Sequence, residues 1–191
     1  MIPTAQKPNY DDGQQGGGVG RRMRLREFQT RLVGRMQAAQ SGTDSHPNHL
    51  GVVIGSKRWL ISLRHAGEIV PVGTITPVPL TQDWFLGVTS IRGTLASVAD
   101  LARFHGEPRT QIDKDSRILA FSPTLAFNGA LLVTRVLGLR NMTQMRETDA
   151  PGDSQLAPWA SAHYVDDDGQ DWIRLDLSLV IQDPRFLHVG I

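Results

Sequence analysis

The sequence predicts an all-β domain with a few short helices, preceded by a separate N-terminal segment. From residue 45 onward, short apolar runs such as Trp59–Leu63 and Trp172–Leu177 recur between turns that carry glycine or proline. These runs are too short, and helical periodicity is too rare, for a doubly wound α/β fold. Short strands at regular spacing are instead typical of a β-barrel architecture.

Composition narrows the possible functions further. The 191 residues suffice for one domain with a core and an appendage. Cysteine is absent, which excludes disulfide and thiolate chemistry. No apolar run approaches the roughly 18 residues of a membrane span, and no secretory signal is visible. We therefore expect a cytoplasmic protein without direct membrane insertion.

The net charge of +1 predicts no strong field toward nucleic acid or membrane. Residues 1–45 carry seven Lys or Arg and four Asp or Glu, a charge of +3. Residues 46–191 carry 13 and 15, a charge of −2. A slightly acidic β domain disfavours the alternative of a small β-barrel that binds nucleic acid, because such a binder needs a basic face with exposed aromatic rings.

The N-terminal residues divide into two parts. Residues 1–20 are rich in glycine and proline and predict a disordered lead. Residues 21–44 predict a basic amphipathic helix and a linker, with arginines flanking one narrow apolar stripe. The stripe consists of Leu25, Phe28, Leu32, Met36 and Ala39. Such a helix packs on its own domain, on a partner or on an anionic lipid surface, and we favour the first two.

The central stretch Trp84–Phe104 predicts two strands joined by a tight corner at Arg92-Gly93. Leu95 and Val98 continue the apolar set after the corner, and Trp84 is expected in the core. Asp100 precedes a short apolar segment as an N-cap carboxylate would, so that Asp100 and His105 are interpreted as the two ends of a helix. The arginine at the corner is held on a rigid element.

Strand, turn and loop signals define the rest of the domain. Trp59–Leu63 and Glu68–Val72 predict a hairpin through Arg64–Gly67, with Pro71 placing the second strand at an edge or a bulge. The further expected elements are a solvated loop at His46–His49, a strand at Ile118–Phe121, two buried strands or one bent strand at 130–139, a loop at 140–162, a turn at Asp166–Gly169, a strand at Trp172–Leu177, a strand or short helix at 178–181 and a strand at Phe186–Ile191.

Residue types that catalyse reactions or bind metals are scattered through the sequence. No nucleophile elbow or ligand spacing is visible, so we predict no catalytic residue, no metal site and no cofactor. The three aspartates at 166–168 lack the alternating ligands and terminal glutamate of a helix–loop–helix calcium site. The sequence therefore favours a binding module over an enzyme.

Several motifs in order resemble CheW-type coupling proteins, the adaptors of bacterial chemosensory arrays. The motif glycine, apolar strand, Asn-Leu-Arg-Gly, apolar strand, Asp-Leu is matched by Gly87, Ile91-Arg92-Gly93 and Asp100-Leu101, with Ser90 in place of the asparagine. Val133–Leu139 and Asp166–Leu177 are similar to later family strands. Three further segments resemble the CheW-type adaptors that control type IV pilus twitching motility. They are the basic helix, the loop before Trp159 and the end at Phe186–Gly190.

The resemblance implies a pair of intertwined SH3-like five-stranded β-barrels over residues 45–191. It implies a non-catalytic adaptor between a CheA-type histidine kinase and the cytoplasmic tip of a methyl-accepting chemoreceptor. Arg92 would face the receptor, with Ser90, Ile91 and Gly93 as its local frame. Without the resemblance, an internal salt bridge of Arg92 that only shapes the corner would be equally plausible. The alternative function is a small β-barrel that binds nucleic acid or another protein-interaction module.

Overall fold

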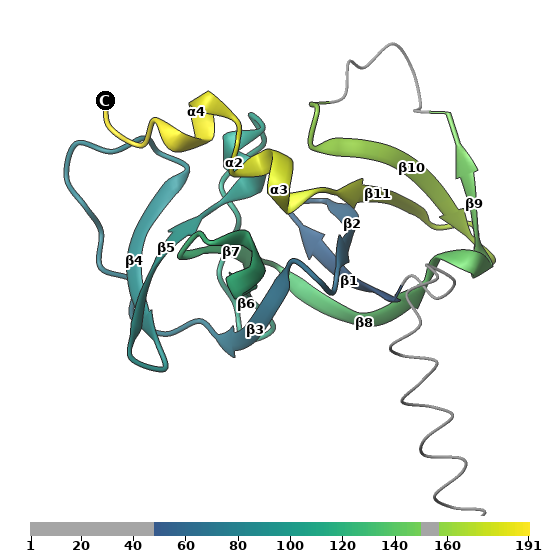
Figure 1. The fold of residues 1–191 in the computed structure, drawn as a ribbon, viewed down its shortest axis with the longest axis horizontal. Coiled ribbons are helices and arrows are strands. Elements are labelled where there is room, and N and C mark those ends of the chain that lie inside the picture. The colour runs from purple at the N-terminus through teal and green to yellow at the C-terminus, as the bar shows by residue number, and fades with distance from the viewer. Residues whose placement is uncertain (1–47, 150–156) are drawn as a thin grey trace, which may run out of the picture. The chain divides into compact units, whose positions relative to one another are not determined.

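The computed structural model describes residues 48–149 and 157–191, and within them it shows two β-sheets with a few short helices (Figure 1). This confirms the predicted fold class. The predicted disordered lead at 1–20 and the predicted amphipathic helix and linker at 21–44 lie outside the described residues, as does the centre of the predicted 140–162 loop. The β domain that contains the described residues, His46–Ile191, is one compact unit.

The first sheet has six strands in the order β8-β1-β2-β11-β10-β9, one more than expected. Its strands are β1 (Asn48–Ile54), β2 (Lys57–Ser62), β8 (Arg135–Asn141), β9 (Met145–Thr148), β10 (Ala160–Asp166) and β11 (Asp171–Leu175). The second sheet has five strands in the order β3-β6-β7-β5-β4. Its strands are β3 (Ala66–Pro71), β4 (Phe85–Ile91), β5 (Thr94–Ala99), β6 (Arg117–Phe121) and β7 (Gly129–Val133).

The chain intertwines the two sheets, as expected from the resemblance. It builds β1 and β2 in the first sheet, crosses to the second for β3 to β7, and returns to the first for β8 to β11. Each strand order ends at two edges, so no hydrogen-bonded seam closes either sheet into a full barrel among the described residues. Within each sheet one parallel contact occurs, β2 with β11 and β5 with β7, because the returning chain inserts beside an earlier strand.

The predicted hairpin through Arg64–Gly67 is wrong. The strand β2 pairs with β1 and β11, whereas β3 pairs with β6 in the other sheet. The hairpin partner of β2 is β1, a strand that was not predicted. It places His49 inside the protein, 8% exposed, instead of in a solvated loop. A turn signal specifies a change of direction, but it does not specify which strand will lie alongside.

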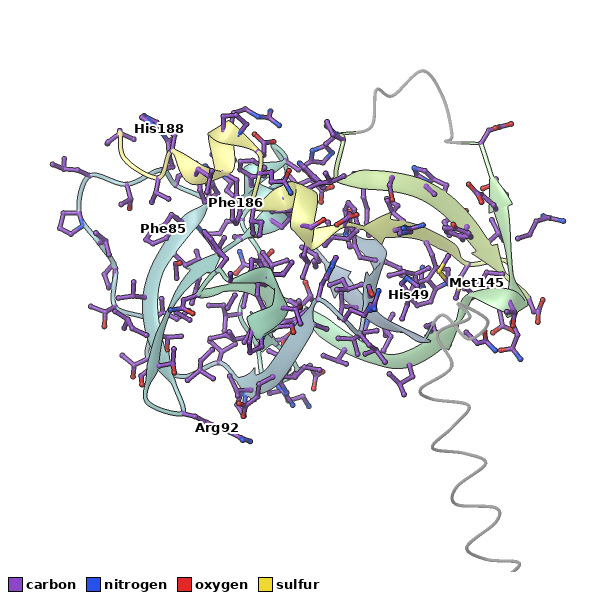
Figure 2. The ribbon with its side chains drawn as sticks, viewed as in Figure 1. His49, Phe85, Arg92, Met145, Phe186 and His188 are labelled. Carbon is purple, nitrogen blue, oxygen red and sulfur yellow. The ribbon has the colours of Figure 1, made fainter. Side chains whose placement is uncertain are left out.

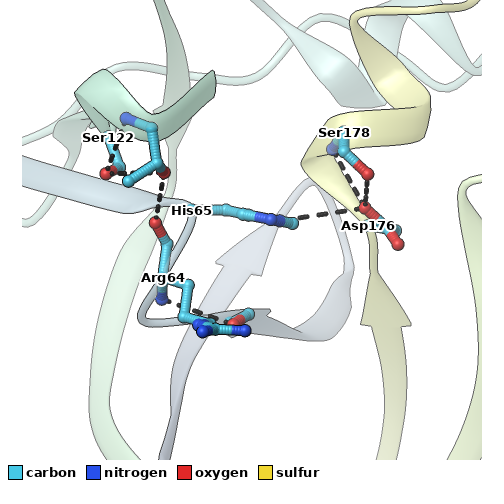
Figure 3. Close-up of polar contacts among 7 residues, drawn as sticks. Arg64, His65, Ser122, Asp176 and Ser178 are labelled. Carbon is cyan, nitrogen blue, oxygen red and sulfur yellow. Dashed lines mark hydrogen bonds and ion pairs between the residues drawn. The ribbon is translucent and has the colours of Figure 1, made fainter. Parts of the chain in front are cut away.

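Polar contacts hold the crossover between the sheets on both sides (Figure 3). Ser122, at the end of β6, donates its backbone N–H to the carbonyl of His65 at 2.8 Å. On the other side, the imidazole Nδ1 of His65 lies 3.8 Å from a carboxylate oxygen of Asp176, which follows β11. The same carboxylate accepts the hydroxyl hydrogen bond of Ser178 at 2.5 Å. The start of β3 is therefore anchored to both sheets.

The buried side chains form three clusters. The largest lies between the sheets and includes Trp59, Leu131, Trp159 and Leu175. A second cluster, centred on Val98 and Leu132, belongs to the second sheet, and a third, centred on Leu60, Tyr164 and Trp172, belongs to the first. Each sheet is thus apolar on both faces, one turned to the partner sheet and one to the sheet's own curved interior, which explains runs without strict alternation such as β7.

Short helices complete the described chain. They are α2 (Leu101–Phe104), α3 (Leu177–Val180), α4 (Pro184–Leu187) and the 3₁₀ turns η1 (Pro123–Leu125) and η2 (Met142–Gln144). The predicted strand at Phe186–Ile191 is wrong, because Asp183 caps a helix with Pro184 in its first turn. The predicted loop at 140–162 is also partly wrong, since it contains the end of β8, η2, β9 and the start of β10.

Candidate functional site

The central stretch folds as predicted into two strands and a helix start. Gly87 in β4 has φ +130°, and a Cβ there would lie 2.1 Å from the carbonyl oxygen of Thr76. This close approach lets Thr76 pair with Val88, its N–H donating to the Val88 carbonyl at 2.8 Å. The extended segment after β3 therefore covers the exposed edge of β4. Trp84 is buried as expected, 7% exposed.

Asp100 fixes the far end of β5. Its carboxylate is fully buried and accepts three hydrogen bonds, from the backbone N–H of Arg103 at 3.3 Å and from the N–H and hydroxyl of Thr110 at 2.7 and 2.8 Å. The predicted N-cap is confirmed, and His105 follows α2 as its C-cap. The carboxylate also ties down the loop after α2, so that Asp100 acts as a structural group in this fold.

Arg92 and Gly93 form a two-residue turn between β4 and β5. Both have positive φ, +49° and +84°, and Ile91 pairs with Thr94 across the turn. Positive φ at both central residues matches the twist of two antiparallel strands. Glycine adopts this conformation freely, but an arginine does so at a cost of about 1 kcal/mol. The corner is therefore as tight as the sequence predicts, with an unexpected strained residue at its first position.

The guanidinium of Arg92 pairs with a carboxylate of the same chain. Its Nε lies 2.7 Å from Oε1 of Glu68 on β3, and the Arg92 side chain remains 81% exposed, against 31% for Glu68. Because β3 and β4 are the two edges of the second sheet, this ion pair spans the gap between those edges. Figure 2 shows the Arg92 side chain extending from the tip of the hairpin, away from the ribbon.

The other predicted site residues surround this corner in different ways. Ser90 is exposed and lies opposite Leu95 in the hairpin, whereas Ile91 is 9% exposed and anchors the corner in the second cluster. Gly93 has open space around the position of a Cβ. Leu95, which continues the apolar set after the corner, is nevertheless 62% exposed, because it shares the outer face of the hairpin with Ser90. The surface beside Arg92 is therefore partly apolar.

Glu68 is the site residue that sequence reasoning missed. It lies 24 positions before Arg92 in the sequence (92 − 68), on the strand at the opposite edge of the same sheet. The sequence offers one weak signal, a single charged side chain within the apolar run of β3. Among the described residues, no group of three or more His, Cys, Asp or Glu could hold a metal ion.

Three comparisons with known proteins bear on this arrangement. The family model of the CheW-like domain matches residues 48–185. The chain belongs to the CheW-like family. Protein PilI of Pseudomonas aeruginosa is 26% identical over 163 residues, covering 84% of this chain and 89% of PilI. Protein FrzA of Myxococcus xanthus is 29% identical over 89 residues, covering 47% of this chain and 55% of FrzA.

A solved structure supports the fold independently. The scaffolding protein TtCheW from Thermoanaerobacter tengcongensis superposes with a TM-score of 0.61 at 19% identity, covering 73% of this chain and 95% of that chain. This CheW-like protein is thus similar to PilI in sequence and to TtCheW in fold, as the sequence motifs predicted. Its described residues contain no helix that is long and apolar enough to cross a membrane.

Proposed function

We propose that this CheW-like protein is a non-catalytic cytoplasmic adaptor that couples a CheA-type histidine kinase to methyl-accepting chemoreceptors, in the pathway that controls type IV pilus twitching motility. The observation that carries the proposal is the family membership combined with an exposed, preorganised arginine at the matching motif position. The similarity to PilI over 84% of the chain supports the pilus branch.

Arg92 is suited to receive a partner. Glu68 forms an ion pair with its Nε at 2.7 Å, and 81% of the Arg92 side chain stays exposed, so that the guanidinium is accessible to a partner. A planar guanidinium recognises a carboxylate or carbonyl with two parallel hydrogen bonds. Because one side of the guanidinium is already fixed, less side-chain entropy is lost when a partner binds. Ser90, Ile91 and Gly93 fix the corner that presents it.

The ion pair with Glu68 does not reduce Arg92 to a purely internal role. Exposed ion pairs contribute only about 0–1 kcal/mol to stability, too little to offset fully the strained backbone at this position. A glycine would make the same turn more easily. We infer that the arginine is useful for something other than shaping the corner, and the second sheet's outer face next to it offers Leu95 as an apolar contact.

A reconstituted pull-down tests the proposal. The full chain is immobilised and mixed with the regulatory domain of a CheA-type kinase, with and without a receptor tip fragment. We expect both partners to be retained, and Arg92→Glu to weaken retention of the receptor fragment at least tenfold while the circular-dichroism melt is unchanged. Retention of neither partner by the wild-type chain would refute the adaptor function, and collapse of the variant fold would support the internal role of Arg92.

A further inference from the structure

A second surface lies at the end of the second sheet remote from Arg92. A hollow of about 550 Å³ opens where α4 meets the segment before β4, and it is lined by Gln82, Trp84, Pro184, Arg185 and His188. Figure 2 places His188 and Arg92 at opposite ends of the β4–β5 half of the protein. The hollow is shallow and open to solvent. The adaptor function proposed above does not use this hollow.

The floor of the hollow is rigid. The indole of Trp84 stacks on Phe186, with ring centroids 5.2 Å apart and planes at 15°, and Phe104 packs edge-on against both rings. The backbone N–H of Gln82 donates to the carbonyl of Val189 at 2.8 Å, which joins the C-terminal residues to this floor. The hollow is therefore formed before any ligand arrives, and ordering it on binding costs little free energy.

Cations dominate the charged groups around the hollow. Arg185 forms two hydrogen bonds with the carboxylate of Asp183 and still exposes 69% of its side chain. Asp83, next to the floor, pairs with Arg103 and also accepts a hydrogen bond from Arg109 at its backbone carbonyl, 2.8 Å away. Three arginines thus share two carboxylates, and no acidic side chain of the described residues is ion-paired with Arg109. These groups leave an excess of one positive charge, carried by Arg109, that is available to a negatively charged partner.

Large exposed apolar side chains lie close in the sequence to the residues that line the hollow. Leu187 is 53% exposed, Leu80 is 76% exposed and Ile191 is 78% exposed. Leu80 also has φ +58°, and its carbonyl accepts the N–H of Ile191 at 3.1 Å, so this exposed leucine is held in a strained conformation. Apolar surface of this kind, flanked by polar groups, marks interaction sites more often than chance exposure does.

We propose that this hollow and these apolar side chains bind an acidic peptide segment of another protein, with one large apolar side chain in the hollow and flanking carboxylates on Arg109 and Arg185. A small anion would satisfy the arginines but leave the apolar side chains exposed, whereas a peptide covers both. Single-stranded nucleic acid fits less well, because Trp84 is only 7% exposed and offers no free ring face for a base.

The test uses the full chain labelled with ¹⁵N and titrated with defined probes. The main probe is an acetylated hexapeptide with two glutamates on each side of a central Trp-Leu pair. We expect a saturable shift of the indole N–H signal of Trp84, which is identified by its loss in Trp84→Phe. Three control probes are the same peptide with lysines for glutamates, the acidic peptide with an Ala-Ala centre, and an oligo-thymidine strand. We expect each to bind at least tenfold more weakly.

Matched variants separate a local site from general charge attraction. Arg109→Glu and Arg58→Glu change the net charge equally, and Arg58 is an exposed residue of the first sheet. We expect Arg109→Glu to weaken the acidic peptide at least tenfold and Arg58→Glu to change its affinity less than twofold. If Arg109→Glu disturbs the fold, Arg185→Ala replaces it as the test variant, and we expect it to weaken binding of the acidic peptide as well. Equal losses in the two charge variants, equal binding of the lysine peptide, stronger binding of the oligo-thymidine, or no shift at Trp84 would each overturn the proposal.

Discussion

Replacing Arg92 by glycine separates the stability of the corner from its function. The substitution relieves a left-handed backbone conformation, φ +49°, worth about 1 kcal/mol. It also removes the ion pair with Glu68, worth about 0.2–1 kcal/mol because the Arg92 side chain is 81% exposed. Glycine further raises the entropy of the unfolded chain, at a cost of about 0.5–1 kcal/mol. The three contributions nearly cancel.

We therefore expect the free energy of unfolding of Arg92→Gly to lie within about 1 kcal/mol of the wild-type value. Urea denaturation followed by tryptophan fluorescence measures it, with Glu68→Gln as the matched control that removes the ion pair but keeps the strained arginine. Receptor-fragment retention should nevertheless fall at least tenfold in Arg92→Gly, because the guanidinium is gone.

Two results would refute this reasoning. A loss of more than about 2 kcal/mol in Arg92→Gly would mean that the ion pair across the sheet edges holds the second sheet together, which exposed pairs do not normally do. Unchanged receptor retention in a folded Arg92→Gly protein would mean that the arginine is not the contact group. The Glu68→Gln control assigns any intermediate loss either to the ion pair or to the backbone.

Three further predictions concern stability, each measured by urea denaturation. Gly87→Ala should lower the free energy of unfolding by at least about 2 kcal/mol, because its Cβ would lie 2.1 Å from a carbonyl oxygen. Gly93→Ala, which has open space around the Cβ, should lower it by only about 1 kcal/mol. Equal losses would contradict the clash at Gly87. Burial raises the pKa of Asp176, but hydrogen bonds from the first turn of α3 outweigh it and hold that pKa below its usual range. The stabilising effect of the Asp176 carboxylate is therefore complete above the ordinary carboxyl pKa and is lost as the pH falls through the lowered pKa. Asp176→Asn should flatten the loss of folding stability below about pH 4. An unchanged dependence of stability on acid pH would contradict this. Phe186→Ala should lower the free energy of unfolding by about 3–5 kcal/mol, whereas Leu187→Ala, at an exposed position, should change it by no more than about 0.5 kcal/mol. Similar losses in the two variants would mean that α4 does not pack as described.

Local signals in the sequence located several parts of the candidate site. The Arg92-Gly93 corner and the cap at Asp100 were identified because each depends on a backbone conformation or a hydrogen bond within a few residues. The apolar run of β7 was also recognised, and its complete burial agrees with a strand that is covered on both faces. These features need no knowledge of the neighbouring strands.

Other features could not be predicted in the same way. The turn at Arg64–Gly67 has the composition of a hairpin, yet the chain crosses there to the other sheet, because β2 is satisfied by β1 and β11. The C-terminal residues alternate well enough for a strand, but Asp183 and Pro184 favour a helical turn that places Phe186 on Trp84. Leu95 is apolar and still faces solvent, since its side of the hairpin is uncovered.

The sequence by itself determined that this chain is an all-β, CheW-like protein with a rigid arginine at the centre of its defining motif. Only the tertiary structure decided which strands share a sheet, that Glu68 meets Arg92 across two sheet edges, and that a hollow lined by Arg185 forms over Trp84. The physical reason is range: caps, turns and buried runs follow from interactions between neighbouring residues, whereas strand pairing and surface clusters depend on which distant segments the whole core brings together.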